Sequence, residues 1–267
     1  MSDQFSRNRL MFGDEGVQAL QRAHVAVFGL GGVGGYAAES LVRSGIGAID
    51  LIDCDTVDIT NVNRQIIATH RTLGMKKTDA AEQRLLDINP ACRITKHDCF
   101  FLPETAHLFS FAQYDYIIDA VDTISAKIEL IVRAQEARTP LISAMGAGNK
   151  MDPTALRVDD IYNTSVCRLA RVMRKELRKR GIAHQKVVYS IEETLTPATP
   201  TQPGGSPADQ EASSERCADS TDTGAQDAVP CTPHPKRATP GSNAFVPSAM
   251  GLVLGAEVAR DLMHLSR

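Results

Sequence analysis

The chain has 267 residues, a formal net charge of −3 and 43% apolar residues. This length and apolar content suit one soluble α/β domain with its own core, and they argue against a fibrous or wholly disordered protein. The negative net charge gives no general attraction to nucleic acid or to anionic membranes, so such contacts would need a local basic patch.

The cysteines and the apolar segments favour a cytoplasmic location. Six cysteines are scattered along the chain without a CxxC pair, which argues against a structural zinc site and favours a reducing compartment. The start of the chain lacks the apolar run of a secretory signal. The longest apolar stretch near the end, residues 245–256, is shorter than the ~20 residues that a spanning helix needs. We therefore expect no membrane span.

Short β-branched runs alternate with segments of helical periodicity through the first half of the chain. This alternation predicts parallel βαβ units, which build a doubly wound, Rossmann-like sheet of the α/β class. The strands are expected over residues 24–28, 48–52, 92–97, 116–121 and 141–144, and the helices over residues 36–44, 78–88 and 125–137.

The alternation changes after Gly146. Strand-like runs occur over residues 155–158 and 186–191, and a strongly basic helical segment, residues 166–180, lies between them. We expect this half to extend the mostly parallel sheet with antiparallel strands.

Residues 198–240 differ in composition from the segments around them. They are rich in Pro, Ser, Thr, Ala, Gly and Asp and contain no aromatic residue, so they cannot bury enough apolar surface to offset their ordering entropy. We expect a disordered insertion within one domain that spans residues 1–267. The chain then resumes with a helix to about residue 265, on which Gly251 and Gly255 share a face that another helix could approach closely.

A glycine-rich segment directly follows the first expected strand and opens the first expected helix. Its glycines, Gly29, Gly31, Gly32 and Gly34, fit the pattern GxGxxG. In this pattern the first glycine permits a tight turn, the second lets backbone approach a phosphate, and the third lets helix and strand pack closely. The helix N-terminus adds free N–H groups for the phosphates. The context favours a nucleotide-binding turn over a merely tight loop.

Charged residues beyond the second strand distinguish between nucleotides. Asp53 ends that strand, where an acidic residue grips a ribose hydroxyl, and this feature suits NAD and ATP equally. Arg64 and Lys77 follow the same strand and should lie near its carboxyl end, where ligands bind. Cations of this kind stabilise the negative charge that spreads over phosphoryl oxygens in nucleotidyl transfer. The pattern therefore favours ATP and leaves an NAD oxidoreductase as a distant alternative.

Asp122 follows the fourth expected strand and should face the same crevice. Its carboxylate could hold Mg²⁺ through oxygen. The alternative is an N-cap for the helix that begins near Thr123. In the company of Arg64 and Lys77, metal binding is the favoured interpretation.

Together these residues resemble the ubiquitin-activating-enzyme-like superfamily, which includes the ThiF and MoeB adenylyltransferases. The resemblance covers nearly the whole chain outside residues 198–240. ThiF and MoeB proteins usually carry two CxxC zinc pairs, and their absence here favours the dehydratase branch, the tRNA threonylcarbamoyladenosine dehydratases. The matching motifs are GxGGxG at 29–34, DxD at 53–55, NxNRQ at 61–65, GxxK at 74–77 and DAxD at 119–122, and further similar segments lie at 5–8, 58–65, 87–90, 146–154 and 241–248.

The resemblance implies an enzyme that uses ATP and Mg²⁺ to adenylate a carboxylate. In the dehydratase branch this carboxylate belongs to threonylcarbamoyladenosine in tRNA, and the ureido group of the same side chain then closes a ring. The matching superfamily positions imply that Arg7, often supplied by the partner in a homodimer, Arg64 and Lys77 act on the phosphates and that Asp122 binds the metal. The residues expected to bind ATP are Gly29, Gly31, Gly32, Gly34, Asp53, Asp55, Asn61, Asn63, Arg64, Gln65 and Lys77.

Two classes of macromolecular substrate remain open. The first is tRNA, whose phosphates a basic helical face could contact, although such a face is often merely solvated. The second is the C-terminus of a ubiquitin-like sulfur carrier, activated as in ThiF and MoeB together with a sulfur-transfer partner protein. A non-catalytic nucleotide-binding module agrees less well with the intact set of charged residues. The candidate tRNA-binding residues are Arg168, Arg171, Lys175 and Arg178.

Overall fold

A computed structural model describes residues 3–196 and 240–264. These residues form one seven-stranded sheet with the strand order β3-β2-β1-β4-β5-β7-β6. The order runs outward in opposite directions from β1 and β4, which makes the carboxyl ends of these two strands the switch point of the sheet. The strands are β1 His24–Phe28, β2 Ala48–Ile52, β3 Arg93–His97, β4 Tyr116–Asp119, β5 Leu141–Ala144, β6 Leu156–Asp160 and β7 Lys186–Ser190.

The sheet is mostly parallel, as predicted. Strand β7 continues the parallel arrangement beside β5, and only β6 is antiparallel to its neighbour within the part of the chain that the structure describes. The predicted antiparallel extension is therefore a single pair, β6 with β7. The doubly wound α/β class predicted from the sequence is confirmed.

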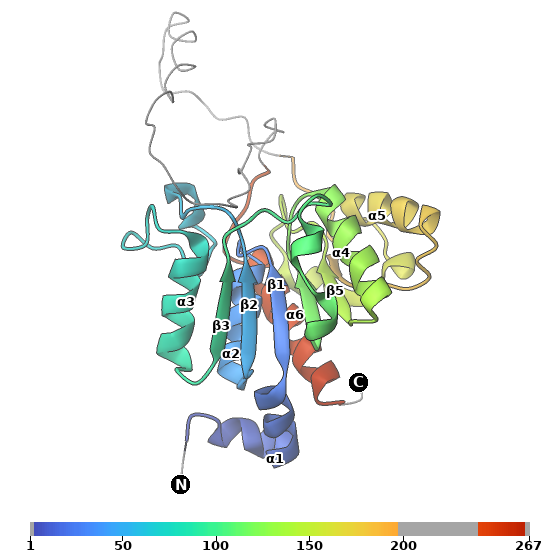
Figure 1. Cartoon of the computed structure of the whole chain (residues 1–267). Helices are drawn as coiled ribbons and strands as arrows, with labels where there is room; N and C mark the ends of the chain where they lie inside the picture. The colour runs from blue at the N-terminus through green and yellow to red at the C-terminus, as the bar shows by residue number, and fades with distance from the viewer. Residues whose placement is uncertain (1–2, 197–239, 265–267) are drawn as a thin grey trace, which may run out of the picture.

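Helices cover both faces of the sheet (Figure 1). Helices α1, α2, α3 and α6 pack on the face that carries Val25, Val27 and Leu51, whereas α4 and α5 pack on the face that carries Phe28 and Ile52. No helix among the described residues is both long and apolar enough to cross a membrane. The helices are α1 Ser6–Arg22, α2 Gly34–Ser44, α3 Lys77–Ile88, α4 Ile124–Ala137, α5 Arg168–Lys179 and α6 Val246–Leu262, and short 3₁₀ turns span Ile59–Asn61, Ala106–Leu108, Phe111–Gln113, Pro153–Ala155 and Ile161–Asn163.

Helix α1 has no counterpart among the elements expected from the sequence. It contains a break at Gly13, whose φ of 69° lies outside the helical range. Its large apolar residues Leu10 and Met11 are exposed, so the segment lacks the regular apolar face by which an amphipathic helix is recognised.

The glycines of α6 bring it into close contact with α2, as their shared face predicted. A methyl group on Gly251 would lie 2.3 Å from the carbonyl oxygen of Val33, and one on Gly255 would lie 2.0 Å from Ser40 Oγ. Glycine at both positions is therefore required for this packing. The contact is made within one chain and joins the last helix to the helix that follows the glycine turn.

Asn149 is hydrogen-bonded to the residues that flank the predicted insertion on both sides. Its N–H donates to the carbonyl oxygen of Gly241 at 2.8 Å, and its carbonyl oxygen accepts the N–H of Leu195, also at 2.8 Å. Asn243 adds a hydrogen bond from its side-chain amide to the carbonyl oxygen of Lys150 at 2.6 Å. The predicted disordered insertion, residues 198–240, lies outside the described residues except for its last position.

Candidate functional site

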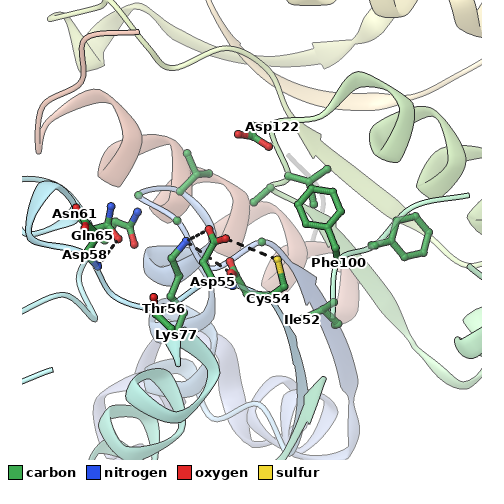
Figure 2. Close-up of a pocket in the computed structure, with 18 of the residues that line it drawn as sticks. Ile52, Cys54, Asp55, Thr56, Asp58, Asn61, Gln65, Lys77, Phe100 and Asp122 are labelled. Carbon is green, nitrogen blue, oxygen red and sulfur yellow. Dashed lines mark hydrogen bonds and ion pairs between the residues drawn. The ribbon is translucent and has the colours of Figure 1, made fainter. Parts of the chain in front are cut away.

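A cavity of about 550 Å³ opens at the carboxyl ends of β1, β2 and β4, at the switch point of the sheet. Figure 2 shows Asn61 and Gln65 on one side, Phe100 on the other, and Lys77 beside Asp55 between them. Ten residues singled out from the sequence line this one cavity: Gly29, Gly31, Gly32, Asp53, Asp55, Asn61, Arg64, Gln65, Lys77 and Asp122.

The glycine turn has the geometry that its sequence pattern requires. Gly29 adopts a φ of +91°, and a methyl group there would lie 2.8 Å from the carbonyl oxygen of Ala120 on the loop after β4. Gly31 has open space around it, so its backbone is accessible from the cavity. A methyl group on Gly34 would lie 1.8 Å from the carbonyl oxygen of Gly29, so this glycine serves helix packing and does not line the cavity.

Asp53 is a nearly buried carboxylate oriented by backbone donors. Its two oxygens accept the N–H of Leu30 at 2.7 Å and the N–H of Asp55 at 2.9 Å. Burial raises the pKa of Asp53, and the nearby Lys77 ammonium opposes that rise. The carboxylate is thus fixed beside the glycine turn, in the position where an acidic side chain can accept ribose hydroxyls.

Lys77, the first residue of α3, carries its ammonium into the same cavity. The Nζ atom lies 2.6 Å from Asp55 Oδ2 and 3.6 Å from Asp53 Oδ1. The Lys77 side chain is 7% exposed, whereas that of Asp55 is 59% exposed. The lysine is therefore the fixed member of the pair, and Asp55 is the member that can be displaced into solvent.

The segment after β2 brings a guanidinium to the rim of the cavity. Arg64 donates to the carbonyl oxygen of Thr60 at 2.8 Å and to Asn63 Oδ1 at 2.9 Å. A 3₁₀ turn positions this segment, because Asp58 and Asn61 form a reciprocal capping box around it. Asn61 thus shapes the loop as well as lining the cavity.

Asn63 and Gln65 differ in how they relate to the cavity. The Asn63 side chain donates to the carbonyl oxygen of Ser242 at 3.0 Å and does not line the cavity, so its contact with ATP stays a prediction. Gln65 lines the cavity and is buried, and among the described residues its Oε1 atom is the buried side-chain oxygen without a hydrogen-bond partner. An unpaired buried acceptor of this kind is costly unless a ligand or water supplies a donor.

Asp122 lies at the edge of the cavity with its carboxylate exposed (Figure 2). Helix α4 begins after Thr123, and no side chain caps it. The alternative role of Asp122 as a helix cap is therefore not realised. Within the described part of the chain, Asp122 accepts a 3.3 Å hydrogen bond from Thr123 Oγ1, which leaves most of its acceptor capacity available.

A buried ion pair supports the loop that carries Asp122. Lys127 Nζ lies 3.1 Å from each oxygen of Asp119 and donates to the carbonyl oxygen of Ala144 at 2.7 Å. Ser143 Oγ donates to the same carboxylate, and Asp119 Oδ1 accepts the N–H of Val121 at 3.2 Å. Sequence reasoning did not identify Lys127 or Ser143, because they lie on different elements from Asp119.

Aromatic residues after β3 form a wall of the cavity that sequence reasoning also missed. Phe100 and Phe101 line the cavity together with Cys99. Phe101 packs edge-to-face against Phe28, with ring centroids 5.0 Å apart. The available signal was positional, since these residues follow a strand parallel to β2 and so must reach the same edge of the sheet.

Arg7 lies apart from this cavity in its own chain. It is exposed in the first turn of α1, and α1 adjoins the amino end of β1, opposite to the glycine turn (Figure 1). Arg7 therefore does not line the nucleotide cavity of its own chain.

The cations of the basic helix α5 and of its C-cap residue, Arg180, fall into two groups. Arg174 donates to the carbonyl oxygen of Thr164 at 2.8 Å, and Lys179 and Arg180 pair with Glu176. These three serve local structure. The other four are exposed and have no ion pair within the described ranges, although the Arg178 guanidinium stacks 5.1 Å above the Tyr162 ring; they are the predicted Arg168, Arg171, Lys175 and Arg178.

The donor set suits a metal ion bound largely through phosphates. No cluster of three or more His, Cys, Asp or Glu side chains able to hold a metal occurs in the described part of the chain. Mg²⁺ characteristically keeps several waters and takes one or two protein carboxylates together with substrate phosphates. A single exposed carboxylate at the edge of the cavity, Asp122, fits that mode.

Comparison with known proteins agrees with this geometry. The tRNA threonylcarbamoyladenosine dehydratase of Bacillus subtilis is 41% identical over 98% of this chain and 96% of its own length. The Escherichia coli dehydratase of the same name is 40% identical over 65% of each chain. The crystal structure of the E. coli tRNA N6-threonylcarbamoyladenosine dehydratase with AMP has a TM-score of 0.78 at 29% identity, covering 98% of this chain and 94% of that one, and the complex with ATP has a TM-score of 0.76. The profile of the ThiF family matches residues 5–262, and this chain therefore belongs to the ThiF family.

Proposed function

We propose that this protein is an ATP-dependent dehydratase that converts threonylcarbamoyladenosine in tRNA to its cyclic form. One observation carries the proposal: the glycine turn, Arg64, Lys77 and Asp122 converge on a single cavity at the switch point of the sheet. This combination of backbone donors, cations and a carboxylate suits a nucleoside triphosphate with its metal. The 41% identity to the B. subtilis dehydratase over nearly both full lengths supports this substrate class.

The reaction removes one water in two steps. An oxygen of the threonylcarbamoyl carboxylate attacks the α-phosphorus of ATP, the bond to the bridging oxygen breaks, and pyrophosphate leaves. The ureido group then attacks the acyl carbon of the adenylate, loses a proton and expels AMP, which carries away the carboxylate oxygen. The substrate holds both reacting groups on one side chain, so ring closure needs no protein nucleophile.

The residues of the cavity take distinct parts in the first step. Asp53 orients the ribose of ATP, and the Lys77 and Arg64 cations stabilise the charge on the phosphoryl oxygens. For Lys77 to contact a phosphate, its ammonium exchanges Asp55, the exposed member of the pair, for a phosphate oxygen. Asp122 would hold Mg²⁺, and a bound ion would neutralise charge on the triphosphate.

Arg7 acts in the partner subunit of a homodimer. Its position beside the exposed side chains of Leu10 and Met11, 88% and 79% exposed, supports a role for α1 in subunit contact. Apolar side chains exposed to this degree on one helix favour burial against a second chain. The guanidinium of Arg7 then completes the phosphate site of the neighbouring subunit.

The four unpaired cations of α5 contact the tRNA backbone. A polyanion is attracted by clustered Arg and Lys even where the whole protein is acidic. Their separation from the paired residues Arg174, Lys179 and Arg180 supports this role, because the four cations remain available to phosphates. A cytoplasmic location follows from the tRNA substrate.

A direct assay tests the proposal. Purified protein is incubated with ATP, Mg²⁺ and threonylcarbamoylated tRNA, and the nucleosides are analysed by mass spectrometry. The expected result is AMP together with a nucleoside lighter by one water. Absence of AMP at every magnesium concentration would contradict the assignment.

The alternative is activation of a ubiquitin-like sulfur carrier, with a sulfur-transfer partner protein downstream. It is favoured if pyrophosphate exchange requires a small protein with a Gly-Gly terminus and ignores the modified tRNA. Parallel exchange assays with the two substrates separate these outcomes.

A further inference from the structure

A second cavity, of about 560 Å³, is lined by the segment that follows β5 and by residues at the start of α5. Its floor includes Gly146, which follows β5, and its rim includes Arg168 and Arg171 of α5. Asp119 of β4 pairs with Ser143 of β5. Asp122, which lines the first cavity, lies three residues after Asp119, and Gly146, which lines the second, lies three residues after Ser143. The two segments therefore leave the sheet from neighbouring strands, which are ~4.8 Å apart.

The residues that line this second cavity carry a small net positive charge, because Arg168, Arg171 and Lys150 outnumber the two carboxylates, Glu192 and Glu193. Arg168 and Arg171 are exposed and without an ion pair in the described part of the chain. Of the two rim carboxylates, Glu192 accepts the N–H groups of Met151 and Asp152 at 2.8 and 3.0 Å, so it is committed to the loop. Glu193 is the other and is exposed.

We propose that this second cavity receives the threonylcarbamoyladenosine nucleoside itself, unstacked from the anticodon loop, while Arg168 holds an adjacent phosphate. The proposal rests on the proposed function and adds the location of the substrate. A volume of this size accommodates a nucleoside, and RNA-recognising proteins commonly bind unstacked bases of loops. The neighbouring position matters because the carboxylate at the end of the base's side chain must meet the α-phosphorus in the first cavity.

The charge distribution favours RNA over a protein terminus at this place. The unpaired cations continue along α5 from Arg168 and Arg171 at the cavity to Lys175 and Arg178 beyond it. A nucleic acid supplies a phosphate for each of them. A protein tail carries one terminal carboxylate, which would lie in the nucleotide cavity and leave all four cations unmatched.

Gly146 allows a steric test. A methyl group there would meet only Leu169 Cβ, at 3.9 Å, and the φ of Gly146 is not in the left-handed region. Gly146→Phe therefore projects its ring into the cavity without backbone strain. The probe is a synthetic anticodon stem-loop that carries threonylcarbamoyladenosine. In Gly146→Phe we expect kcat/KM for the stem-loop to fall by about tenfold or more, and in Gly146→Ala by a smaller factor. The dissociation constant of ATP should stay within about twofold of the wild-type value in both variants.

Arg168→Glu provides an electrostatic test with a matched control. It should lower kcat/KM for the stem-loop by about tenfold, while Lys179→Glu, the same charge change on a residue paired with Glu176, should have an effect of about twofold or less. The proposal is overturned if Gly146→Phe retains wild-type kcat/KM, or if the Lys179 variant loses as much as the Arg168 variant.

Three further results show whether this inference, the proposed function or both would fail. An equal loss of ATP affinity in Gly146→Phe would assign the second cavity to the nucleotide and overturn the nucleoside site alone. If the wild-type enzyme cyclises full-length tRNA but Gly146→Phe is equally active on it, the dehydratase function stands and the location fails. If the wild-type protein forms no AMP with full-length tRNA and none with the stem-loop, the proposed function and the nucleoside site both fail.

Discussion

Lys77 Nζ and Asp55 Oδ2 are 2.6 Å apart at the wall of the nucleotide cavity, and only the aspartate is open to solvent. This pairing holds the ammonium in place before any phosphate arrives. Preorganised charge of this kind lowers a reaction barrier because no reorganisation is needed when the transition state forms.

Lys77→Met should therefore impair nucleotidyl transfer severely. We expect ATP–pyrophosphate exchange, in the presence of the carboxylate substrate, to fall by about 10²-fold or more, as is typical when one electrostatic stabiliser is removed. Circular dichroism and thermal unfolding serve as controls for the fold. Exchange within about threefold of wild type would mean that Lys77 is not a phosphate ligand in the transition state.

Asp122→Asn should alter the response to magnesium. The amide keeps the shape of the carboxylate but loses its charge, so the site should need more Mg²⁺ for half-maximal exchange, by about tenfold. The test is a titration of exchange rate with Mg²⁺ at fixed ATP. If the variant and wild type have superimposable titrations, the metal is held elsewhere.

Charge reversal on α5 should weaken tRNA binding and leave ATP binding intact. Replacing both Arg171 and Lys175 by Glu should reduce the affinity for full-length tRNA by about tenfold and flatten its dependence on salt, because fewer counterions are released. Filter binding at several salt concentrations measures both quantities. The double variant Lys179→Glu and Arg180→Glu is the control, since both residues are paired with Glu176; a similar loss in that variant would indicate a non-specific effect of net charge.

Removing one member of the buried pair below the Asp122 loop should destabilise the fold. Lys127→Met leaves the Asp119 carboxylate buried without its ammonium, and breaking a pair of this kind costs about 3 kcal/mol or more. Urea unfolding gives the free energy of unfolding. Asp119→Asn should lower the free energy of unfolding by less in the Lys127→Met variant than in the wild-type protein. An equal decrease in both proteins would show that the two residues are not coupled.

A second buried carboxylate, that of Asp50, makes the free energy of unfolding depend on pH. Burial raises the pKa of Asp50, but hydrogen bonds from His97, His24 and Tyr114 outweigh it and lower the pKa from 3.8 to about 2. A lowered pKa stabilises the folded state above pH 4, and this contribution of about 2 kcal/mol is lost as the pH falls from 4 through 2. Asp50→Asn should be less stable than wild type at pH 7, and the difference should shrink at pH 3 in urea unfolding. A constant difference across this range would contradict the linkage.

The sequence was most informative where function depends on local pattern. The glycine turn, the aspartate after β2 and the cations that follow could all be placed at one edge of the sheet, because parallel strands carry their carboxyl ends to the same side. Asp53, Arg64 and Lys77 indeed share one cavity. The face formed by Gly251 and Gly255 was likewise readable, since helical periodicity relates residues four apart.

What the sequence did not reveal depends on contacts between distant elements. The Asp119–Lys127–Ser143 network joins β4, α4 and β5, and the hydrogen bonds of His24 and His97 to Asp50 join three strands. No spacing rule connects such residues until the topology is known. Asn63 is a further example, since its motif predicts a ligand contact, whereas the hydrogen bond of its side chain to Ser242, far along the chain, could not be foreseen from that motif.

Asn149 has a consequence for how this protein tolerates variation. Because the backbone of this one residue joins both Leu195 and Gly241, the separation of those two points is set by the framework and not by the sequence that connects them. Insertions or deletions between them can therefore accumulate without shifting β7 or α6 relative to the sheet. This makes the stretch between Leu195 and Gly241 a natural place for relatives to diverge in length, and for an engineer to graft a reporter domain while the nucleotide cavity keeps its shape.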